Sequence, residues 1–134
     1  MIGCGYFLQW YFVNKLMRDH KKLRAFELAD EAAILIYRIT QSFPKEEIYG
    51  LTSQMRRAAV SVPSNIVEGC ARESRAEYMR FLEIAFGSLQ ELHYQLRLAR
   101  RLGFLSEGSG LEADSLLDET GKVLGALIRS LRKE

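Results

Sequence analysis

Apolar residues recur every three to four positions along successive stretches of this chain, and this periodicity limits its fold more than any other feature. At about 100° per residue, the pattern places apolar side chains on one helical face over residues 51–66, 78–99 and 113–131. The first of these faces consists of Leu51, Met55, Ala58, Val62 and Ile66, and the last of Ala113, Leu116, Thr120, Val123, Leu127 and Leu131. No stretch alternates convincingly between apolar and polar residues, as a half-buried strand does. The pattern therefore predicts an all-α protein.

A further helix, the first in the chain, is predicted over residues 26–41 and carries apolar residues on two faces. One face contains Phe26, Ala29, Ala33, Ile36, Tyr37 and Thr40, and the second contains Leu28, Ala32, Leu35 and Ile39. Together they cover roughly 200° of the helix, whereas the apolar stripe of a surface helix covers about 100°. We expect its own domain to cover one side of this helix and another subunit to cover the other, with Val60 and Val67 adding to the intersubunit surface.

Residues that favour helix ends divide these stretches. Pro44 suits the first turn of the second helix, and Gly103 suits the position just beyond the end of the third. Capping-box patterns, in which a serine is followed three residues later by a glutamate, occupy Ser74–Glu77 and Ser109–Glu112 and predict the starts of the third and fourth helices. Four helices joined by short connections predict an antiparallel up-down-up-down four-helix bundle.

The first residues differ from the rest of the chain. The stretch MIGCGYFLQWYFVNK is apolar and aromatic, but it lacks a basic start and a cleavage site. It is also shorter than the about 20 residues that span a bilayer as a helix. We expect residues 1–16 to form an N-terminal extension, either disordered or added by an upstream start, and residues 17–134 to form the bundle; contact of the extension with a membrane surface is the alternative. Cys4 and Cys70 match no metal or redox spacing, which favours a reducing cytoplasm.

The sequence SVPSNIVEG, residues 61–69, places a proline inside the second predicted helix, where a kink is expected. Polar residues line one edge of the apolar stripe of this helix and face matching positions on the third helix. We call this set the polar seam; it contains Gln54, Arg57, Ser61, Asn65, Glu68, Ser88, Glu91 and Gln95. We expect Arg57 to pair with Glu91, and Ser61 or Asn65 to bond across to the third helix, because an unsatisfied buried polar group costs about 1–3 kcal/mol.

An enzymatic interpretation would make Glu68 and Glu91 an acid–base or metal-binding pair. Neither residue belongs to a Glu-x-x-His arrangement of the di-iron bundle type, and His20 and His93 are far apart in the sequence. The chain also lacks the glycine-rich phosphate-binding motifs, the nucleophile elbow and a Cys-x-x-Cys pair. We therefore expect no catalytic residue, no metal and no cofactor.

A net charge of only +2 means that attraction to polyanions depends on how the charges cluster. In an up-down-up-down bundle, the starts of the first and third helices share one end with the termini of the second and fourth. We call the cations expected there the basic end; they are Lys21, Lys22, Arg24, Arg72, Arg75, Arg129, Arg132 and Lys133. The opposite end is expected to collect acids, among them Glu46, Glu47, Glu107, Glu112, Asp114, Asp118 and Glu119. The basic end is a candidate nucleic-acid-binding surface, and the alternative is that its cations complement helix C-termini at about 0.3–1 kcal/mol each.

The block FPKEEIYGLTSQMRRAAVSVPSNIVEG, followed by GSLQE in the third helix, resembles the four-helix-bundle intervening-sequence protein family. The founding members of that family are reading frames within insertions in bacterial large-subunit ribosomal RNA genes. The resemblance covers about residues 19–134. It implies a four-helix bundle assembled as a homopentamer, with no recognised catalytic site.

The chain is also similar to the accessory variability protein of diversity-generating retroelements. That protein is a basic pentameric barrel that associates with reverse transcriptase and nucleic acid, so the similarity makes nucleic-acid association an expectation here. Residues that fall on the family pattern are interpreted as determinants of fold and assembly; they are Arg56, Arg57, Asn65, Glu68, Gly87, Ser88 and Glu91.

Three functions follow from these observations. The first is a non-enzymatic, cytoplasmic homo-oligomer, most simply a pentamer, that acts as an adaptor associated with RNA, DNA or a nucleic-acid enzyme such as a reverse transcriptase. The second is a protein-binding structural scaffold without nucleic-acid contact. The third is an enzyme that uses Glu68 and Glu91. None of the three requires contact with a membrane.

Overall fold

The computed structural model describes residues 5–6 and 18–133. Within these residues the chain forms four long helices and no strand, which confirms the all-α prediction. The helices are α2 (Arg24–Ile39), α3 (Leu51–Cys70), α4 (Arg75–Arg101) and α5 (Glu107–Lys133), with short 3-10 turns η1 (His20–Lys22), η2 (Thr40–Ser42) and η3 (Lys45–Glu47) around α2. Apart from residues 5–6, the predicted N-terminal extension lies outside the described residues.

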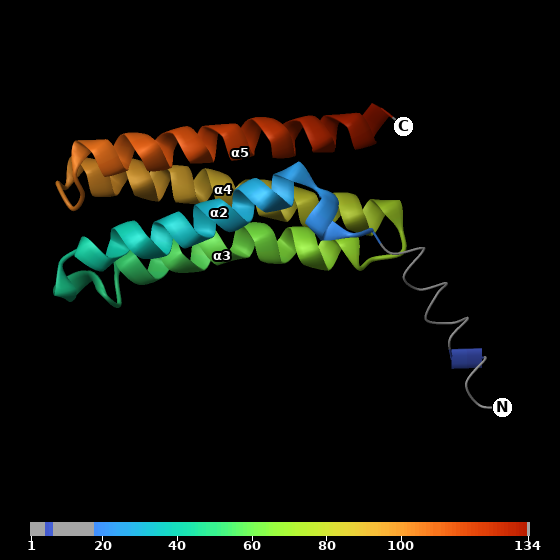
Figure 1. The fold of residues 1–134 in the computed structure, drawn as a ribbon, viewed down its shortest axis with the longest axis horizontal. Coiled ribbons are helices and arrows are strands. Elements are labelled where there is room, and N and C mark those ends of the chain that lie inside the picture. Colours follow the sequence, from blue (N-terminus) through green and yellow to red (C-terminus); the bar gives the residue numbers. More distant parts are fainter. Residues whose placement is uncertain (1–4, 7–17, 134) are drawn as a thin grey trace.

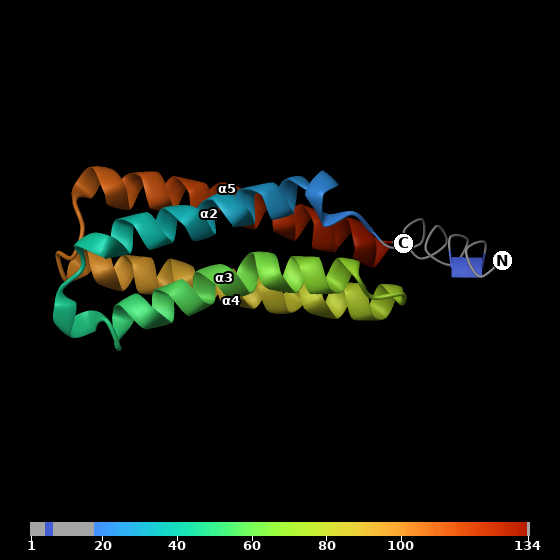
Figure 2. The ribbon, with the colours of Figure 1, turned by 60° about the horizontal axis from the view of Figure 1, so that its bottom comes forward.

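The four helices lie side by side, and each packs against two others (Figures 1 and 2). α3 contacts α2 and α4, while α5 contacts α2 and α4, so the helices surround a shared core. The connections from α2 to α3 and from α4 to α5 lie at one end of the molecule, and the connection from α3 to α4 lies at the other, next to the C-terminal end of α5 (Figures 1 and 2).

The apolar stripes predicted for α3 and α4 form the centre of the core. Every predicted position of the α3 stripe is buried, from Leu51 to Ile66. On α4 the buried positions repeat with helical spacing and include Tyr78, Leu82, Leu89 and Leu96. These two helices therefore follow the sequence pattern closely, because apolar side chains placed on one face of a helix leave water together.

The face predicted for α5 is correct at Ala113 and Thr120, which are buried, but it is displaced by one position at Leu116, Val123 and Leu127. Leu117, Leu124 and Ile128 are buried, whereas the predicted Leu116 and Leu127 are only partly buried. Contacts with α2 and α4 set the rotation of α5 about its own axis. In adjacent apolar pairs such as Leu116–Leu117 and Leu127–Ile128, the second residue therefore faces the core.

α2 is apolar on two sides, as its wide apolar arc indicates. Its inner side is buried against the core through Ala25, Leu28, Ala29, Ala32 and Ile36. Its outer side leaves Ile34 46% and Tyr37 44% exposed in a single subunit. One side of the helix is thus covered by its own domain, and the other remains open.

The two predicted ends of α4 are confirmed. The hydroxyl oxygen of Ser74 accepts a hydrogen bond from the backbone N–H of Glu77 at 3.0 Å, as in a capping box. At the other end Gly103 has φ +75°, a left-handed conformation that glycine adopts without strain. The N–H of Gly103 bonds to the carbonyl of Arg100, and that of Phe104 to Ala99, which is the Schellman pattern.

The predicted starts of α3 and α5 are wrong. α5 begins at Glu107, because the hydroxyl of Ser106 accepts from the N–H of Ser109 at 3.2 Å and performs the capping expected of Ser109. α3 begins at Leu51, seven residues after Pro44, since the chain first forms the turn η3. The carboxylate of Glu47 then accepts from the N–H of Leu51 at 2.9 Å and replaces a serine or aspartate cap.

Pro63 does not end α3. The helix is continuous from Leu51 to Cys70, and Pro63 is buried within it. The proline lies off the core stripe of α3 and lines a hollow together with Phe26 and Ala33 of α2. Packing against α2 compensates for the hydrogen bond that a proline removes from a helix.

Candidate functional site

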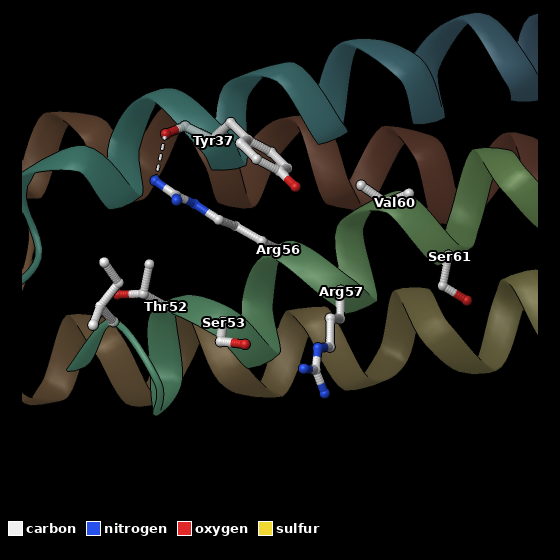
Figure 3. Close-up of a pocket in the computed structure, with 8 residues that line it drawn as sticks. Tyr37, Thr52, Ser53, Arg56, Arg57, Val60 and Ser61 are labelled. Atoms are coloured by element: carbon white, nitrogen blue, oxygen red, sulfur yellow. Dashed lines mark hydrogen bonds between the residues drawn. The ribbon is translucent and has the colours of Figure 1, made fainter.

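A groove runs along the outer side of α2 and α3. One part of it is a cavity of about 520 Å³, shown in Figure 3. The residues that line this cavity are Tyr37, Ile48, Thr52, Ser53, Arg56, Arg57, Val60 and Ser61. Two further hollows continue along the same side. One shares Tyr37 with the cavity, the other shares Val60 with it, and the two hollows share Ala33. We call this surface the α2–α3 groove.

Arg56 ties α3 to the end of α2 across the groove. Its Nε donates to the hydroxyl of Thr40 at 2.9 Å. Its Nη2 donates to the carbonyl of Tyr37 at 3.5 Å, the bond drawn in Figure 3. The guanidinium carbon also lies 4.8 Å from the centre of the Tyr37 ring, in cation–π contact. The sequence marks Arg56 as a family residue but does not reveal this tether, because helical periodicity says nothing about contacts between helices.

Among the described residues, the side chains of Thr52 and Arg57 in the groove lack a polar or charged partner. The hydroxyl of Thr52 is buried without a hydrogen bond in the part of the chain that is described. Arg57 is exposed, points away from Arg56 (Figure 3) and has no carboxylate within 4.0 Å among the described residues. A buried unsatisfied hydroxyl is unfavourable, so the groove has polar groups available to a molecule that covers it.

The polar seam is shorter than predicted. The hydroxyl oxygens of Ser61 and Ser88 lie 2.7 Å apart and join α3 to α4. Asn65 donates to the carbonyl of Ser61 at 2.8 Å and to its hydroxyl at 3.0 Å, so it supports the junction from within α3. The side chain of Gln95 donates to Glu91 at 3.1 Å, one turn apart on α4. Within a single subunit, Ser61, Asn65 and Ser88 thus connect α3 to α4, whereas the bond between Gln95 and Glu91 runs along α4.

The other predicted members of the seam behave differently. Arg57 does not pair with Glu91, since their ion pair is missing among the described residues and Glu91 instead accepts from Gln95. Glu68 forms an exposed salt bridge with Arg72 at 2.9 Å. Gln54 is exposed. Long side chains at the edge of a helix can reach a neighbour on the same helix or solvent. Glu68 and Glu91 pair within their own segments, and Gln54 and Arg57 extend into solvent.

The described residues contain no group of three or more histidine, cysteine, aspartate or glutamate side chains that could hold a metal ion. Glu68 and Glu91 have separate partners, Arg72 and Gln95. The arrangement therefore gives these two carboxylates no common site.

The basic end is assembled by contacts between segments far apart in the sequence. Arg75, at the start of α4, donates to the carbonyl of Leu131 near the end of α5. Arg18 donates to the carbonyl of Arg72 at 2.9 Å, and its guanidinium carbon lies 4.1 Å from the centre of the Tyr78 ring. These contacts hold the segment before η1, the α3–α4 connection and the end of α5 at one end of the molecule. The sequence analysis did not predict a role for Arg18, although Arg18 lies just before the predicted basic residues Lys21 and Lys22.

Arg24 does not belong to the basic end. It bonds to Glu119 at 3.3 Å and to Glu27 at 3.2 Å. Glu119 lies in the middle of α5 and was expected at the opposite, acidic end. The start of α2 is therefore set back along the bundle.

The remaining cations of the basic end fall into two groups. Arg72 and Arg132 are neutralised by Glu68 and Glu83, each at 2.9 Å. The others lack a carboxylate within 4.0 Å among the described residues and are exposed; they are Lys21, Lys22, Arg129 and Lys133. Within the basic end, these four described cations are available to an external anion. At the other end of the bundle, Lys45, Arg97 and Arg101 likewise lack a carboxylate within 4.0 Å in the described part of the chain.

A buried pair of ionisable groups lies beneath the basic end. Burial raises the pKa of Tyr78 to about 12, and burial also raises the pKa of the Cys70 thiol. Both side chains are almost fully buried, and Arg18 lies over the Tyr78 ring. The pair is thus part of the core in its neutral form.

Comparison with known families identifies the chain. Residues 21–126 match the family of 23S rRNA-intervening sequence proteins, and the chain belongs to this family. The resemblance inferred from the sequence motifs is therefore confirmed. No curated protein matches the chain.

The fold recurs in solved structures. One of these is a crystal structure at 1.70 Å resolution of a protein with unknown function from the S23 ribosomal protein family of Bacteroides thetaiotaomicron. The two proteins are 23% identical and superpose with a TM-score of 0.70, over 78% of this chain and 97% of that one. Within the described residues, no helix combines the length and the apolar character needed to cross a membrane.

Proposed function

We propose that this protein is a non-enzymatic up-down-up-down bundle that assembles into a cyclic homo-oligomer and associates with nucleic acid through its basic end. The observation that carries the nucleic-acid assignment is the group of cations without carboxylate partners, Lys21, Lys22, Arg129 and Lys133. Phosphate backbones attract such cations and release counterions when they bind. A ring of subunits would repeat the basic end, so a modest net charge per chain would still produce a strongly cationic surface.

The assembly part of the proposal is supported by the α2–α3 groove. Ile34, Tyr37, Val60 and Val67 are between 36% and 46% exposed there, beside the unpartnered hydroxyl of Thr52. A contiguous apolar surface of this kind is typical of protein interfaces. Covering it with a second copy would remove these side chains from water and would explain why the outer side of α2 is apolar.

The nucleic-acid assignment is tested with a charge-neutralised variant. We would measure the binding of a fluorescein-labelled RNA by anisotropy over a series of salt concentrations, for the wild type and for Lys21→Gln/Lys22→Gln/Lys133→Gln. The variant should bind more weakly, and the slope of log affinity against log salt should fall by about 0.7–0.9 for each phosphate that the variant no longer neutralises.

The matched control carries three neutralised cations at the other end of the bundle, Lys45→Gln/Arg97→Gln/Arg101→Gln. None of these three has a carboxylate partner within 4.0 Å among the described residues, so the two triple variants differ mainly in position. Equal weakening in both would contradict the basic end as the contact surface.

A protein-binding scaffold is the second candidate function, and the α2–α3 groove favours it. If the purified oligomer binds neither RNA nor DNA at low salt, the scaffold remains and the nucleic-acid assignment fails.

A further inference from the structure

We propose that a cavity between α4 and α5 holds one base of a single-stranded nucleic acid, and this inference rests on the proposed nucleic-acid association. The cavity has a volume of about 380 Å³ and lies near the C-terminal end of α5. It is lined by Glu83, Phe86, Gly125, Ile128, Arg129 and Arg132. An aromatic ring, aliphatic surface and two guanidinium groups are the side chains that single-stranded nucleic acids use for stacking and phosphate contacts.

The inner part of the cavity is apolar. Ile128 and Gly125 are buried, and Phe86 is partly buried while still facing the cavity. Phe86 packs against the core, is only partly buried and lines the cavity. A base that stacks on this ring would therefore meet a surface that the protein already holds in place.

Gly125 keeps this space open. It sits in the interior of α5 with no positive φ, so the backbone does not require glycine there. A Cβ atom at this position would lie 3.7 Å from Phe86, an ordinary contact, and 3.2 Å from the mobile end of Arg129. Neither neighbour excludes a side chain, although alanine favours a helix interior over glycine. Packing inside the subunit thus does not require glycine at this position, and the space that the missing side chain leaves between Phe86 and Arg129 is open to a ligand.

The charges of the cavity favour a nucleotide over a bare anion. Arg132 is held by Glu83 at 2.9 Å, and Arg129 has no carboxylate within 4.0 Å among the described residues. One guanidinium is therefore available for a phosphate. The Glu83 carboxylate repels a bare phosphate, but it can accept a hydrogen bond from the exocyclic amino group of a base such as cytosine. The two opposite charges therefore suit a nucleotide, which has both a phosphate for Arg129 and an amino group for Glu83.

The cavity accepts a base only from a single strand. In a duplex, bases are stacked on their neighbours and paired, and their faces cannot reach a protein ring. In a single strand, bases can turn outward and stack on aromatic side chains. The inference therefore predicts that binding at this cavity distinguishes single-stranded from double-stranded RNA.

The test compares Phe86→Ala with the wild-type oligomer, using labelled oligocytidylate, an RNA duplex of equal length and heparin. Removal of one stacking ring should weaken oligocytidylate binding by about five- to 150-fold, with little change for the duplex and heparin. Phe86→Trp should retain the binding, and its added indole fluorescence should be quenched by the oligonucleotide. Tyr94→Ala is the matched control, because Tyr94 is an aromatic residue of the same helix that is 63% exposed outside this cavity.

Because Phe86 also contacts the core, Gly125→Leu provides a second variant that fills the cavity without removing the ring. It should weaken oligocytidylate binding as Phe86→Ala does, and thermal unfolding and oligomer mass are measured for both. If either folded variant binds oligocytidylate as tightly as the wild type, the cavity is not a base-binding site. The proposed function would still stand if binding remained salt-sensitive and dependent on Lys21, Lys22 and Lys133. Equal weakening for oligocytidylate, duplex and heparin would also overturn base binding at the cavity, since charge alone would then account for binding. A wild type that binds no nucleic acid would overturn the proposed function and the cavity together.

Discussion

The hydroxyl oxygens of Ser61 on α3 and Ser88 on α4 lie 2.7 Å apart, and they form a polar contact between two helices whose interface is otherwise mainly apolar. The amide of Asn65 donates to the hydroxyl oxygen of Ser61 at 3.0 Å, and the hydroxyl hydrogen of Ser61 can then be donated to Ser88. The contact fixes the register of α3 against α4, because a shift of one helix along the other would separate the two hydroxyls.

Replacing Asn65 with leucine should destabilise the fold. The substitution removes two hydrogen bonds to Ser61, at 2.8 and 3.0 Å. It should lower the free energy of unfolding by about 1–3 kcal/mol, since each bond contributes about 0.5–1.5 kcal/mol. Urea unfolding followed by circular dichroism measures the decrease. Gln54→Leu, an exposed position of the same helix, is the control and should change the midpoint little.

Replacing Gly103 with alanine should also destabilise the protein. The residue has φ +75°, a conformation that costs a residue with a Cβ about 1–2 kcal/mol. Gly121→Ala is the matched control, because Gly121 lies inside α5 and an added Cβ would make only an ordinary contact with Leu89 at 3.5 Å. That substitution should stabilise the helix by about 0.5–1 kcal/mol. The opposite signs of the two effects in thermal or urea unfolding provide the test, and two effects of the same sign would contradict it.

The sequence predicts the parts of the fold that depend on local pattern. The stripes of α3 and α4 follow the periodicity, since residues at helical spacing such as Met55 and Val62 on α3, and Leu89 and Leu96 on α4, are buried. On α5 the apolar residues come in adjacent pairs, such as Leu116–Leu117 and Leu127–Ile128. Periodicity cannot choose between the members of a pair, and the core selects the second, so the predicted face was displaced.

The candidate sites were less predictable because they depend on helix lengths and on long side chains. Arg24 meets Glu119 because α2 has 16 residues and α5 has 27, so the start of α2 lies beside the middle of α5. The expected pair of Arg57 with Glu91 failed because Glu91 accepts from Gln95 on its own helix. The cavity at Phe86 has no signature in the sequence, since its residues come from separate turns of two helices.

The stability of the protein should fall at alkaline pH because of Tyr78. Burial raises its pKa to about 12, against an ordinary value near 10. Between these values the unfolded chain loses the proton first, so it binds fewer protons than the folded chain and the free energy of unfolding falls as pH rises. The contribution is fully present below about pH 10, and about 2–3 kcal/mol is lost by about pH 12. The raised pKa of Cys70 acts in the same direction.

Urea midpoints measured from pH 8 to pH 11.5 check this prediction. Tyr78→Phe keeps the aromatic ring in the core but has no ionisable hydroxyl. Its midpoint should therefore fall less steeply with pH than that of the wild type. Parallel curves for the two proteins would show that another group controls the decrease in stability at alkaline pH.

Charge introduced into the α2–α3 groove should prevent assembly without unfolding the subunit. Val60 is 42% exposed on α3 and lines two hollows of the groove, so glutamate at this position can reach solvent in a monomer. In an oligomer that covers the groove, the carboxylate would be buried without a partner, which costs several kcal/mol. Val60→Glu should therefore shift the mass measured by light scattering from that of an oligomer to that of a monomer.

Leu111→Glu is the matched control, since Leu111 is 56% exposed on α5, away from the groove. Unchanged circular dichroism with a reduced mass in Val60→Glu alone is the expected result, whereas an intact oligomer in that variant would place the subunit contact elsewhere.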